Sequence, residues 1–348
     1  MATQSGLVFT APGSPLNVVD NLPRLHPERG QVLIKPEFVA LCPVDSLMAQ
    51  TGAFVTDTPA VLGSGFYGTV TEVGFGCARL KEGDLVFGLG SLGRTAYSPF
   101  QDSFLIDERL PFRKGKILSP QDAASLGVSL TTAALGIFAG RHMLAPKRSE
   151  SVRELQEWVV ILGGSGNVGQ CAIQLGRFCG FKIAASCSLS NRKTVVKNGA
   201  HATFDSRATV EKQVAEVLHI THGNEVGHFM HVFDASGVGH DVAFESLKRS
   251  TENFKFFSTV DASGSFAAPA PIKEYRVQAG MLSYPGDKNV KDADEVARMA
   301  PVLDEYIENG DIRPAEFDIF DGVGWGALKD ALGRYNPESR KTMVVRVQ

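Results

Sequence analysis

The hydrophobic pattern changes once along the chain, near its middle. Up to about residue 120, apolar residues come in short runs interrupted by glycine and proline, as in QVLIKPEFVAL and GDLVFGLG. Such runs predict short β-strands joined by turns. From Trp158 to Val260, short strands rich in valine, isoleucine and phenylalanine alternate with helical segments. That alternation predicts a parallel, doubly wound sheet.

The alternating region predicts strands and helices in turn. The strands are WVVIL, FKIAASC, ATFDS, FMHVFDAS and FKFFSTV; one helix begins near Asn167, and others run through RKTVVKNGA, VEKQVAEVLHI and DVAFESLKR. In VEKQVAEVLHI the apolar residues Val210, Val214, Val217 and Leu218 recur at helical spacing. Short, apolar strands between helices are typical of a sheet that is covered on both faces.

The last part of the chain, after Pro285, predicts two more helices and a strand. The first helix carries Val296, Ala300, Leu303 and Ile307 on one face and ends at Gly310. Pro301 lies inside this helix and is expected to kink or restart it. A shorter helix around Trp325 to Leu332 leads to a final strand in KTMVVRVQ.

Length and composition narrow the class of protein. A chain of 348 residues is longer than one hydrophobic core usually supports, so two lobes are expected. With 43% hydrophobic and 21% charged residues and a formal net charge of -3, it does not resemble a nucleic-acid or membrane-surface binder. Its five cysteines form no CxxC pair, which fits a reducing compartment, and MATQSGLVFTAPGSP lacks the features of a secretory signal. We therefore expect a cytoplasmic protein.

One uncharged stretch, Ala123 to Gly140, approaches the length of a membrane span. Three glycines and four hydroxyl side chains interrupt it. We expect a buried helix lining a cleft rather than a span.

The glycine-rich stretch VVILGGSGNVGQ carries the main chemical signal. Gly164, Gly166 and Gly169 form a GxGxxG between a predicted strand and a predicted helix. Glycines there permit a tight turn and let the backbone approach a diphosphate at the helix N-terminus, which predicts a dinucleotide site. The alternative is merely a tight turn. A serine-hydrolase elbow needs GxSxG, but position 167 is Asn, so Ser165 is interpreted as a phosphate donor.

The end of the next strand indicates which dinucleotide. An NAD site needs Asp or Glu there for the ribose diol, but the strand ends in Cys187, Ser188, Leu189, Ser190, Asn191, Arg192 and Lys193. Hydroxyls and two cations suit a 2′-phosphate, so the predicted cofactor is NADPH. The alternative is a solvated basic turn.

Metal and thiol chemistry have weak support. His219 with His222, and His228 with His231, form two HxxH pairs. In a strand, a separation of three places His228 and His231 on opposite faces, and no Cys or carboxylate cluster completes a ligand set, so we expect no metal. Cys171, Cys179 and Cys187 are interpreted as packing residues.

The order of the motifs resembles the medium-chain dehydrogenase/reductase superfamily, and within it the zinc-independent members. The closest likeness is to the trans-acting enoyl reductases that serve fungal polyketide synthases. The resemblance covers nearly the whole chain and is carried by ALCPVDSLMAQTG, PAVLGSGFYGTV, GDLVFG, SLGVSLTTAALGIF, the glycine loop, GAHATFDSR, VFDASG and SRKTMVVRV.

The resemblance implies an α/β protein of two domains. A GroES-like, β-rich catalytic domain would comprise residues 1–120 and 287–348, and a Rossmann domain with a doubly wound parallel sheet would comprise 121–286, with NADPH in the cleft. The substrate pocket would be lined by Thr132, Ala133, Ala134, Leu135, Gly136, Ile137, Phe138 and Ala139, and by Val277, Gln278, Ala279, Gly280 and Met281. The cofactor would lie beside Val44, Asp45, Ser46 and Leu47, and its phosphates and ribose would be held by Gly164, Ser165, Gly166, Asn167, Val168, Ser188, Leu189, Ser190, Asn191, Arg192, Lys193, Ser206, Arg340 and Lys341.

The chain departs from its relatives at several positions. Cys42 stands where zinc-dependent relatives have a cysteine ligand, but Ser64 and Gly65 replace their His-Glu pair, and the four-cysteine lobe is missing. A catalytic zinc needs three protein ligands, so none is expected. Zinc-free relatives usually have Asn and Lys where this chain has Cys42 and Leu47, and commonly Asp where it has Gly65.

The leading hypothesis is NADPH-dependent reduction of an activated carbon–carbon double bond, on a small or carrier-bound acyl substrate with a polyketide synthase as partner. The protein must align the hydride and polarise the carbonyl, and candidate donors are Thr131 or Thr132 and Tyr67. Alternatives are a non-redox cyclase or isomerase on the same fold, a quinone or alkenal reductase, and a scaffold subunit.

Overall fold

The computed structural model describes residues 3–139, 146–148, 154–222, 229–261, 264–282, 290–339 and 341–348. The chain divides into two compact units. Unit 1 comprises Met1–Thr131 with Ala279–Gln348, and unit 2 comprises Thr132–Gln278. The division expected from the sequence, after residues 120 and 286, differs from these limits and stays a prediction about the domains.

Unit 1 is built on β-sheets. In its described residues, a seven-stranded sheet has the order β15-β16-β3-β5-β6-β8 with β7 paired to β3, and a three-stranded sheet has the order β2-β1-β4. The strands are β1 (Thr3–Phe9), β2 (Asn17–Pro23), β3 (Gln31–Leu41), β4 (Ala60–Val61), β5 (Gly65–Val73), β6 (Leu85–Leu89), β7 (Phe104–Asp107), β8 (Phe112–Arg113), β15 (Phe317–Val323) and β16 (Thr342–Arg346). The β-rich N-terminal region is therefore confirmed.

The longest strand, β3, lies inside the large sheet, between β16 and β5. Nearly all of its side chains are buried there. It pairs antiparallel with β5, and this register sets Ala40 opposite Gly65. Cys42, just after β3, is thereby close to Ser64, just before β5. Helix α1 (Pro43–Thr51) follows β3 at once, with proline in its first turn and Gly52 as its left-handed cap.

The C-terminal part of unit 1 adds the predicted helices α7 (Val290–Glu308) and α8 (Trp325–Arg334). Short 3₁₀ turns are η1 (Thr95–Tyr97), η3 (Ala279–Met281) and η4 (Pro337–Ser339). Pro301 does not restart α7, because the helix runs through it, and the alternative of a kink at Pro301 stays a prediction. Pro301 is exposed, and the buried Val296, Ala300 and Leu303 hold the helix on both sides of it.

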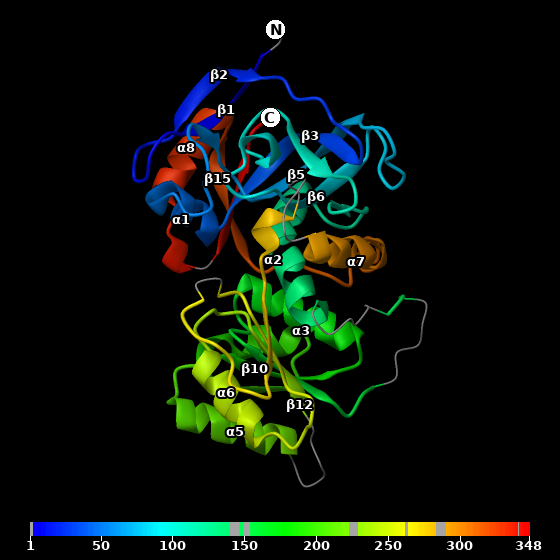
Figure 1. Cartoon of the computed structure of the whole chain (residues 1–348), viewed down its shortest axis with the longest axis vertical. Helices are drawn as coiled ribbons and strands as arrows, with labels where there is room; N and C mark the ends of the chain where they lie inside the picture. The colour runs from blue at the N-terminus through cyan, green and yellow to red at the C-terminus, as the bar shows by residue number, and fades with distance from the viewer. Residues whose placement is uncertain are drawn as a thin grey trace. The chain divides into compact units, whose positions relative to one another are not determined.

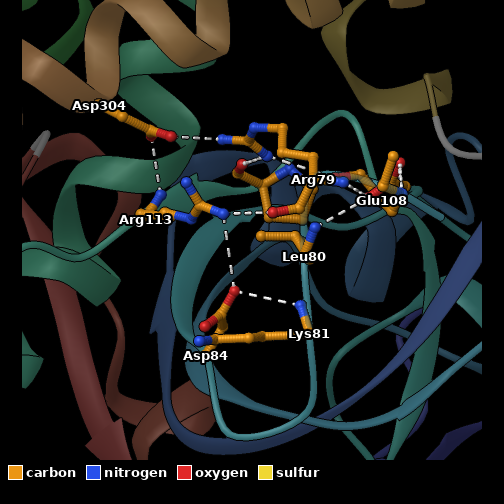
Figure 2. A network of polar contacts seen from close by, with 9 residues as sticks. Arg79, Leu80, Lys81, Asp84, Glu108, Arg113 and Asp304 are labelled. Carbon is orange, nitrogen blue, oxygen red and sulfur yellow. Dashed lines mark hydrogen bonds and ion pairs between the residues drawn. The ribbon is translucent and has the colours of Figure 1, made fainter.

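A buried polar network fastens α7 to the sheet of unit 1 (Figure 2). Asp304 on α7 accepts a hydrogen bond from Arg79 Nη2 at 2.7 Å and from the backbone N–H of Arg113 at 2.8 Å. Arg79 also donates to the carbonyls of Glu108 and Pro111. The Glu108 carboxylate in turn accepts the backbone N–H groups of Ala78, Arg79 and Leu80 at 2.8–3.0 Å. The same network of charged side chains thus holds both α7 and the loop that precedes β6.

Unit 2 contains a parallel sheet with helices on both faces (Figure 1). The strand order is β11-β10-β9-β12-β13-β14, which is that of a dinucleotide-binding Rossmann fold. The strands are β9 (Trp158–Leu162), β10 (Lys182–Cys187), β11 (Ala202–Asp205), β12 (Phe229–Asp234), β13 (Phe256–Thr259) and β14 (Lys273–Arg276). The helices are α3 (Asn167–Phe178), α4 (Arg192–Lys197), α5 (Val210–His222) and α6 (His240–Arg249), with η2 (Leu189–Asn191) before α4. The predicted fold class is confirmed.

The uncharged stretch at Ala123 to Gly140 corresponds to α2 (Pro120–Phe138), whose sequence crosses the limit between the two units. Most of its side chains are buried, as expected. Of the helices in the described part of the chain, none combines the length and apolar character needed to cross a membrane.

Candidate functional site

The glycine loop lies at the carboxyl end of β9, where the strand order of the sheet reverses. A Cβ atom on Gly164 would lie 2.8 Å from Ala185 Cβ, and one on Gly169 would collide with the backbone of Gly163. A Cβ on Gly166 would meet only Gly163 O, at 3.5 Å. Two of the glycines are therefore needed for packing, whereas the third leaves open space on the surface of the loop.

Helix α3 begins directly behind this loop, with Gly166 as its N-cap. The backbone N–H groups of its first residues have no partner within the helix, and they carry the positive end of the helix dipole. Ser165 to Val168 are partly exposed, whereas Gly169 to Gly176 are buried. The open face at Gly166 and these N–H groups fit the diphosphate of a dinucleotide.

Ser186, which the sequence did not single out, fixes the loop from the neighbouring strand. Its Oγ accepts the N–H of Gly163 at 2.8 Å, and its carbonyl accepts the N–H of Gly164 at 2.8 Å. Gly163 has φ +78°, the left-handed conformation that favours glycine. Only the pairing of β10 with β9 brings Ser186 to this position.

The predicted 2′-phosphate residues gather at the ends of β10 and β11. Ser188 Oγ and Ser190 Oγ are 3.0 Å apart, and the N–H of Ser206 donates to Cys187 O at 3.1 Å. Arg192 is exposed, and its Nε donates to Thr203 Oγ1 at 2.7 Å. Lys193 is also exposed. Hydroxyls beside an anchored guanidinium, without an acid at the end of β10, fit a phosphorylated ribose.

A second loop at this edge of the sheet is organised by Asp234, at the end of β12. Its fully buried Oδ1 accepts the N–H of Ser236, the hydroxyl of Ser236 and the N–H of Gly237 at 2.6–3.1 Å. Its Oδ2 accepts the N–H of Gly239 at 2.8 Å. A buried carboxylate needs such donors, and here they fix the turn that faces the glycine loop: a Cβ on Gly163 would lie 2.9 Å from Ser236 Cβ.

In unit 1, Asp45 is the most perturbed member of the predicted set. Its side chain is fully buried; Oδ2 accepts the hydroxyl of Ser64 at 2.6 Å and the N–H of Cys42 at 2.8 Å. Its Oδ1 has no hydrogen-bond partner. Burial raises the pKa of Asp45 to about 7, against the opposing effect of these hydrogen bonds. Asp45 is buried and holds the start of α1 through its hydrogen bond with the N–H of Cys42. Leu47, on the same helix, is 45% exposed.

Cys42 and the histidines are the remaining residues that the sequence raised as possible metal ligands. Burial, and then the nearby Asp45, raises the pKa of the Cys42 thiol to about 12. In the described residues there is no group of three His, Cys, Asp or Glu side chains that could hold an ion. His231 is buried, with Nε2 2.7 Å from Ser258 Oγ, and His228 lies outside the described residues.

The candidate donors differ in how their hydroxyls are used. Thr131 Oγ1 donates to Gly127 O at 2.9 Å, within the same helix. Thr132 is partly exposed. Tyr67 is buried against Phe38, and its pKa is raised by burial and then by Glu37. The catalytic roles of Thr132 and Tyr67 stay predictions.

The other predicted residues lie as follows. Ala133 to Phe138 are buried in α2, Ala139 directly after it is also buried, and Gly136 leaves no room for a Cβ beside Phe233. Val277 is buried and Gln278 exposed in unit 2, whereas Ala279, Gly280 and Met281 form η3 in unit 1. Lys341 lies 3.6 Å from Glu316 and 3.9 Å from Asp318, and Arg340 lies outside the described residues.

The sequence of unit 1 matches a known family model. Residues 28–102 match the alcohol dehydrogenase GroES-like domain. The trans-enoyl reductase grgB of Penicillium sp is 32% identical over 211 residues, 59% of this chain and 57% of that protein. A zinc-type alcohol dehydrogenase-like protein of Schizosaccharomyces pombe is 26% identical over 355 residues, 95% of this chain and 97% of that protein. The chain thus spans little more than half of the Penicillium reductase but nearly all of the yeast protein.

Solved structures share the fold over the whole chain. An alcohol dehydrogenase superfamily protein from Novosphingobium aromaticivorans superposes with a TM-score of 0.74 at 22% identity, covering 99% of this chain and 100% of the other. CurK enoyl reductase gives a TM-score of 0.74 at 19% identity, covering 99% of both chains. At these identities the likeness is one of fold.

Proposed function

Because the chain belongs to the medium-chain dehydrogenase/reductase superfamily, close to the fungal trans-enoyl reductases, we propose that it reduces an activated carbon–carbon double bond with NADPH. The observation that carries the proposal is the arrangement at the carboxyl edge of the unit 2 sheet. Open space at Gly166, the first turn of α3, and Ser188 with Arg192 together suit a phosphorylated dinucleotide.

NADPH supplies the hydride in this reaction. The protein's own residues hold the cofactor and fix its orientation: the N–H groups at the start of α3 bind the diphosphate, and Ser188, Arg192 and Lys193 bind the 2′-phosphate. Asp234 and Ser186 keep the two loops in shape. The hydroxyl of Thr132 would donate to the substrate carbonyl, whose oxygen gains negative charge as the β-carbon takes the hydride, and solvent would supply the proton that the α-carbon then takes.

The proposed substrate is an enoyl thioester carried by a polyketide synthase, in the cytoplasm. Relatives named trans-enoyl reductase from Aspergillus japonicus, Trichoderma harzianum and Fusarium heterosporum, each 32–33% identical over part of the chain, support this class. A trans-acting enzyme meets its substrate on a separate protein, so free short thioesters are suitable test substrates.

The test measures NADPH consumption by the purified protein with a series of 2-enoyl N-acetylcysteamine thioesters. We expect NADPH loss that depends on the thioester, and a saturated thioester as product. Gly166→Asp should abolish it because a carboxylate would occupy the place of the diphosphate. Gly326→Asp, at another glycine with open space, should keep it. Absence of NADPH loss with every thioester, despite NADPH binding, would refute the proposal.

The cofactor preference has its own test. Arg192→Ala and Lys193→Ala should each weaken NADPH binding by about tenfold or more, the value of one charge-assisted hydrogen bond, and leave NADH binding unchanged. Isothermal titration calorimetry with both coenzymes measures this. Equal losses for NADPH and NADH would mean that neither cation contacts a 2′-phosphate.

A second candidate is a non-redox cyclase or isomerase on the same fold. It is favoured by two apolar positions: Leu47 on α1 is 45% exposed, and a Cβ on Gly65 would lie 2.8 Å from Ala40 Cβ, so no acidic side chain fits at Gly65. An apolar pocket can promote such a reaction by holding a reactive conformer. Product formed without NADPH and unchanged by Gly166→Asp would favour this candidate.

A quinone or alkenal reductase is distinguished from the enoyl reductase by its substrates. The same assay with a quinone and a simple alkenal in place of the thioester measures this. Turnover of these compounds but of no thioester would replace the proposed substrate class and leave NADPH as the cofactor.

A further inference from the structure

Phe54, in the loop after α1, has an unusual backbone conformation. Its φ is +67°, and it is the one non-glycine residue with a positive φ in the described part of the chain. A left-handed backbone is unfavourable for a side chain with a Cβ, and most so for a bulky one, whereas glycine adopts it freely. The chain nevertheless has a phenylalanine there, and its side chain stays 39% exposed.

The surrounding loop imposes this conformation. Thr51 Oγ1 donates to Leu47 O at 2.8 Å and accepts the N–H of Ala53 at 3.2 Å. The N–H of Val55 donates to Gly52 O at 3.1 Å and closes a turn around Phe54. Gly93 approaches from the other side: a Cβ there would lie 2.7 Å from the carbonyl carbon of Phe54. The left-handed backbone is therefore set by contacts on both sides of the residue.

The loop at Gly93 also supports part of the predicted substrate-binding set. The N–H of Leu92 donates to Gly280 O at 2.7 Å, and a Cβ on Gly280 would lie 2.6 Å from Leu92 Cγ. Leu92 and Gly93 thus lie between η3 and the loop of Phe54, all within unit 1. Phe54 is the residue of this group that combines a large apolar side chain with exposure, since Leu92 is 5% exposed.

We propose that Phe54 is a specificity-determining residue whose ring contacts the acyl chain of the substrate. The inference rests on the proposed enoyl reductase function and deepens it. A large apolar side chain at a backbone position that favours glycine is kept for what the ring binds rather than for the fold. A ring that contacts the chain beyond the thioester selects long acyl groups over short ones, because only the long ones reach it.

The test uses variants that separate the ring from the backbone. Phe54→Ala and Phe54→Gly both remove the ring, and Phe54→Leu keeps an apolar side chain. We expect the ratio of kcat/KM for a 2-decenoyl over a 2-butenoyl N-acetylcysteamine thioester to fall about tenfold or more in the first two variants and less in Phe54→Leu. Phe75→Ala, which removes another exposed ring of unit 1, should leave the ratio unchanged.

Thermal unfolding tests the backbone argument independently of catalysis. In ordinary backbone, Gly is less stable than Ala; at a left-handed position the order reverses. We expect the Tm of Phe54→Gly to exceed that of Phe54→Ala by about 2–4 °C. The opposite order would overturn the claim that Phe54 occupies a strained position.

A binding measurement distinguishes failure of the inference from failure of the proposed function. Calorimetry with the saturated decanoyl and butanoyl N-acetylcysteamine thioesters needs no turnover. If the wild-type protein reduces no thioester, and Phe54→Ala binds the decanoyl compound more weakly than the wild type does, the reductase proposal fails and the assignment of Phe54 stands. If affinity and turnover of the long thioester are both unchanged in Phe54→Ala, the assignment is wrong.

Discussion

At the scale of single residues, Asp45 shows how burial turns one carboxyl group into a determinant of stability. Burial raises the pKa of Asp45 from the ordinary 3.8 to about 7 in the folded protein, so the folded state keeps a proton that the unfolded state releases between those two pH values. The unfolded state therefore binds fewer protons in this window, and the free energy of unfolding falls as pH rises. Above the folded pKa the effect of Asp45 is constant.

We predict that Asp45→Asn removes this pH dependence. Between pH 4 and 7 one such group contributes a slope of about 1.4 kcal/mol per pH unit, and Asn can still accept from Ser64 and Cys42 through its carbonyl oxygen. Urea unfolding of wild type and variant across this range measures the difference in slope. Ser64→Ala should extend the slope to higher pH, because the Ser64 hydrogen bond lowers the pKa of Asp45. Identical slopes in wild type and Asp45→Asn would contradict the prediction.

The sequence predicts those features of the candidate site that depend on neighbours in the chain. The position of Gly164, Gly166 and Gly169 in a loop between a strand and a helix could be predicted because strand, loop and helix are consecutive. Ser186 and Asp234 could not, because their partners come from adjacent strands whose pairing no local pattern reveals. The hydrogen bond from Thr131 Oγ1 to Gly127 O could likewise be known only from the structure.

At the scale of elements, helical periodicity was the reliable signal and polar edge strands were the weak one. The apolar faces of α5 and α7 were read correctly from the spacing of their residues. β14 was missed because its sequence, KEYR, is polar, as suits a strand at the sheet edge whose residues are exposed or half-buried. Proline removes one backbone donor, but α7 continues through Pro301 because packing on both sides holds the helix together.

The element-scale prediction concerns the attachment of α7. Asp304→Asn leaves the Arg79 guanidinium, 14% exposed, without its carboxylate, so we expect a loss of about 3 kcal/mol in the free energy of unfolding. Asp294 lies on the same helix as Asp304 and forms an exposed ion pair with Arg109. Asp294→Asn breaks this pair and should change the free energy of unfolding by less than about 1 kcal/mol. Urea unfolding of the two variants measures both values. Equal effects would mean that the network in Figure 2 adds no more than a surface ion pair.

At the scale of the whole molecule, the order of motifs carried more information than any one of them. Many proteins contain a glycine loop, a β-rich start or a closing strand. The order of these three features along the chain predicted a GroES-like fold together with a Rossmann fold, as the structure has them. The limit between the two compact units leaves no local signal in the sequence, since α2 continues across Thr131 and Thr132 without a break in its apolar pattern. A boundary inside a helix leaves no turn or polar linker in the sequence.

A cofactor that binds only the folded protein must stabilise it, which allows a whole-molecule prediction independent of turnover. At a concentration one hundred times its dissociation constant, NADPH should add about 2.7 kcal/mol to the free energy of unfolding and raise the Tm. Scanning calorimetry with NADPH, NADH and neither should give the largest shift for NADPH. Gly166→Asp should show no shift, and Gly326→Asp the full one. Since the proposed cofactor-binding residues Gly164 to Val168 and Ser188 to Lys193 lie in unit 2, the increase in Tm should appear first in the transition in which unit 2 unfolds. A shift confined to unit 1, or equal for both coenzymes, would place the site or its phosphate preference elsewhere.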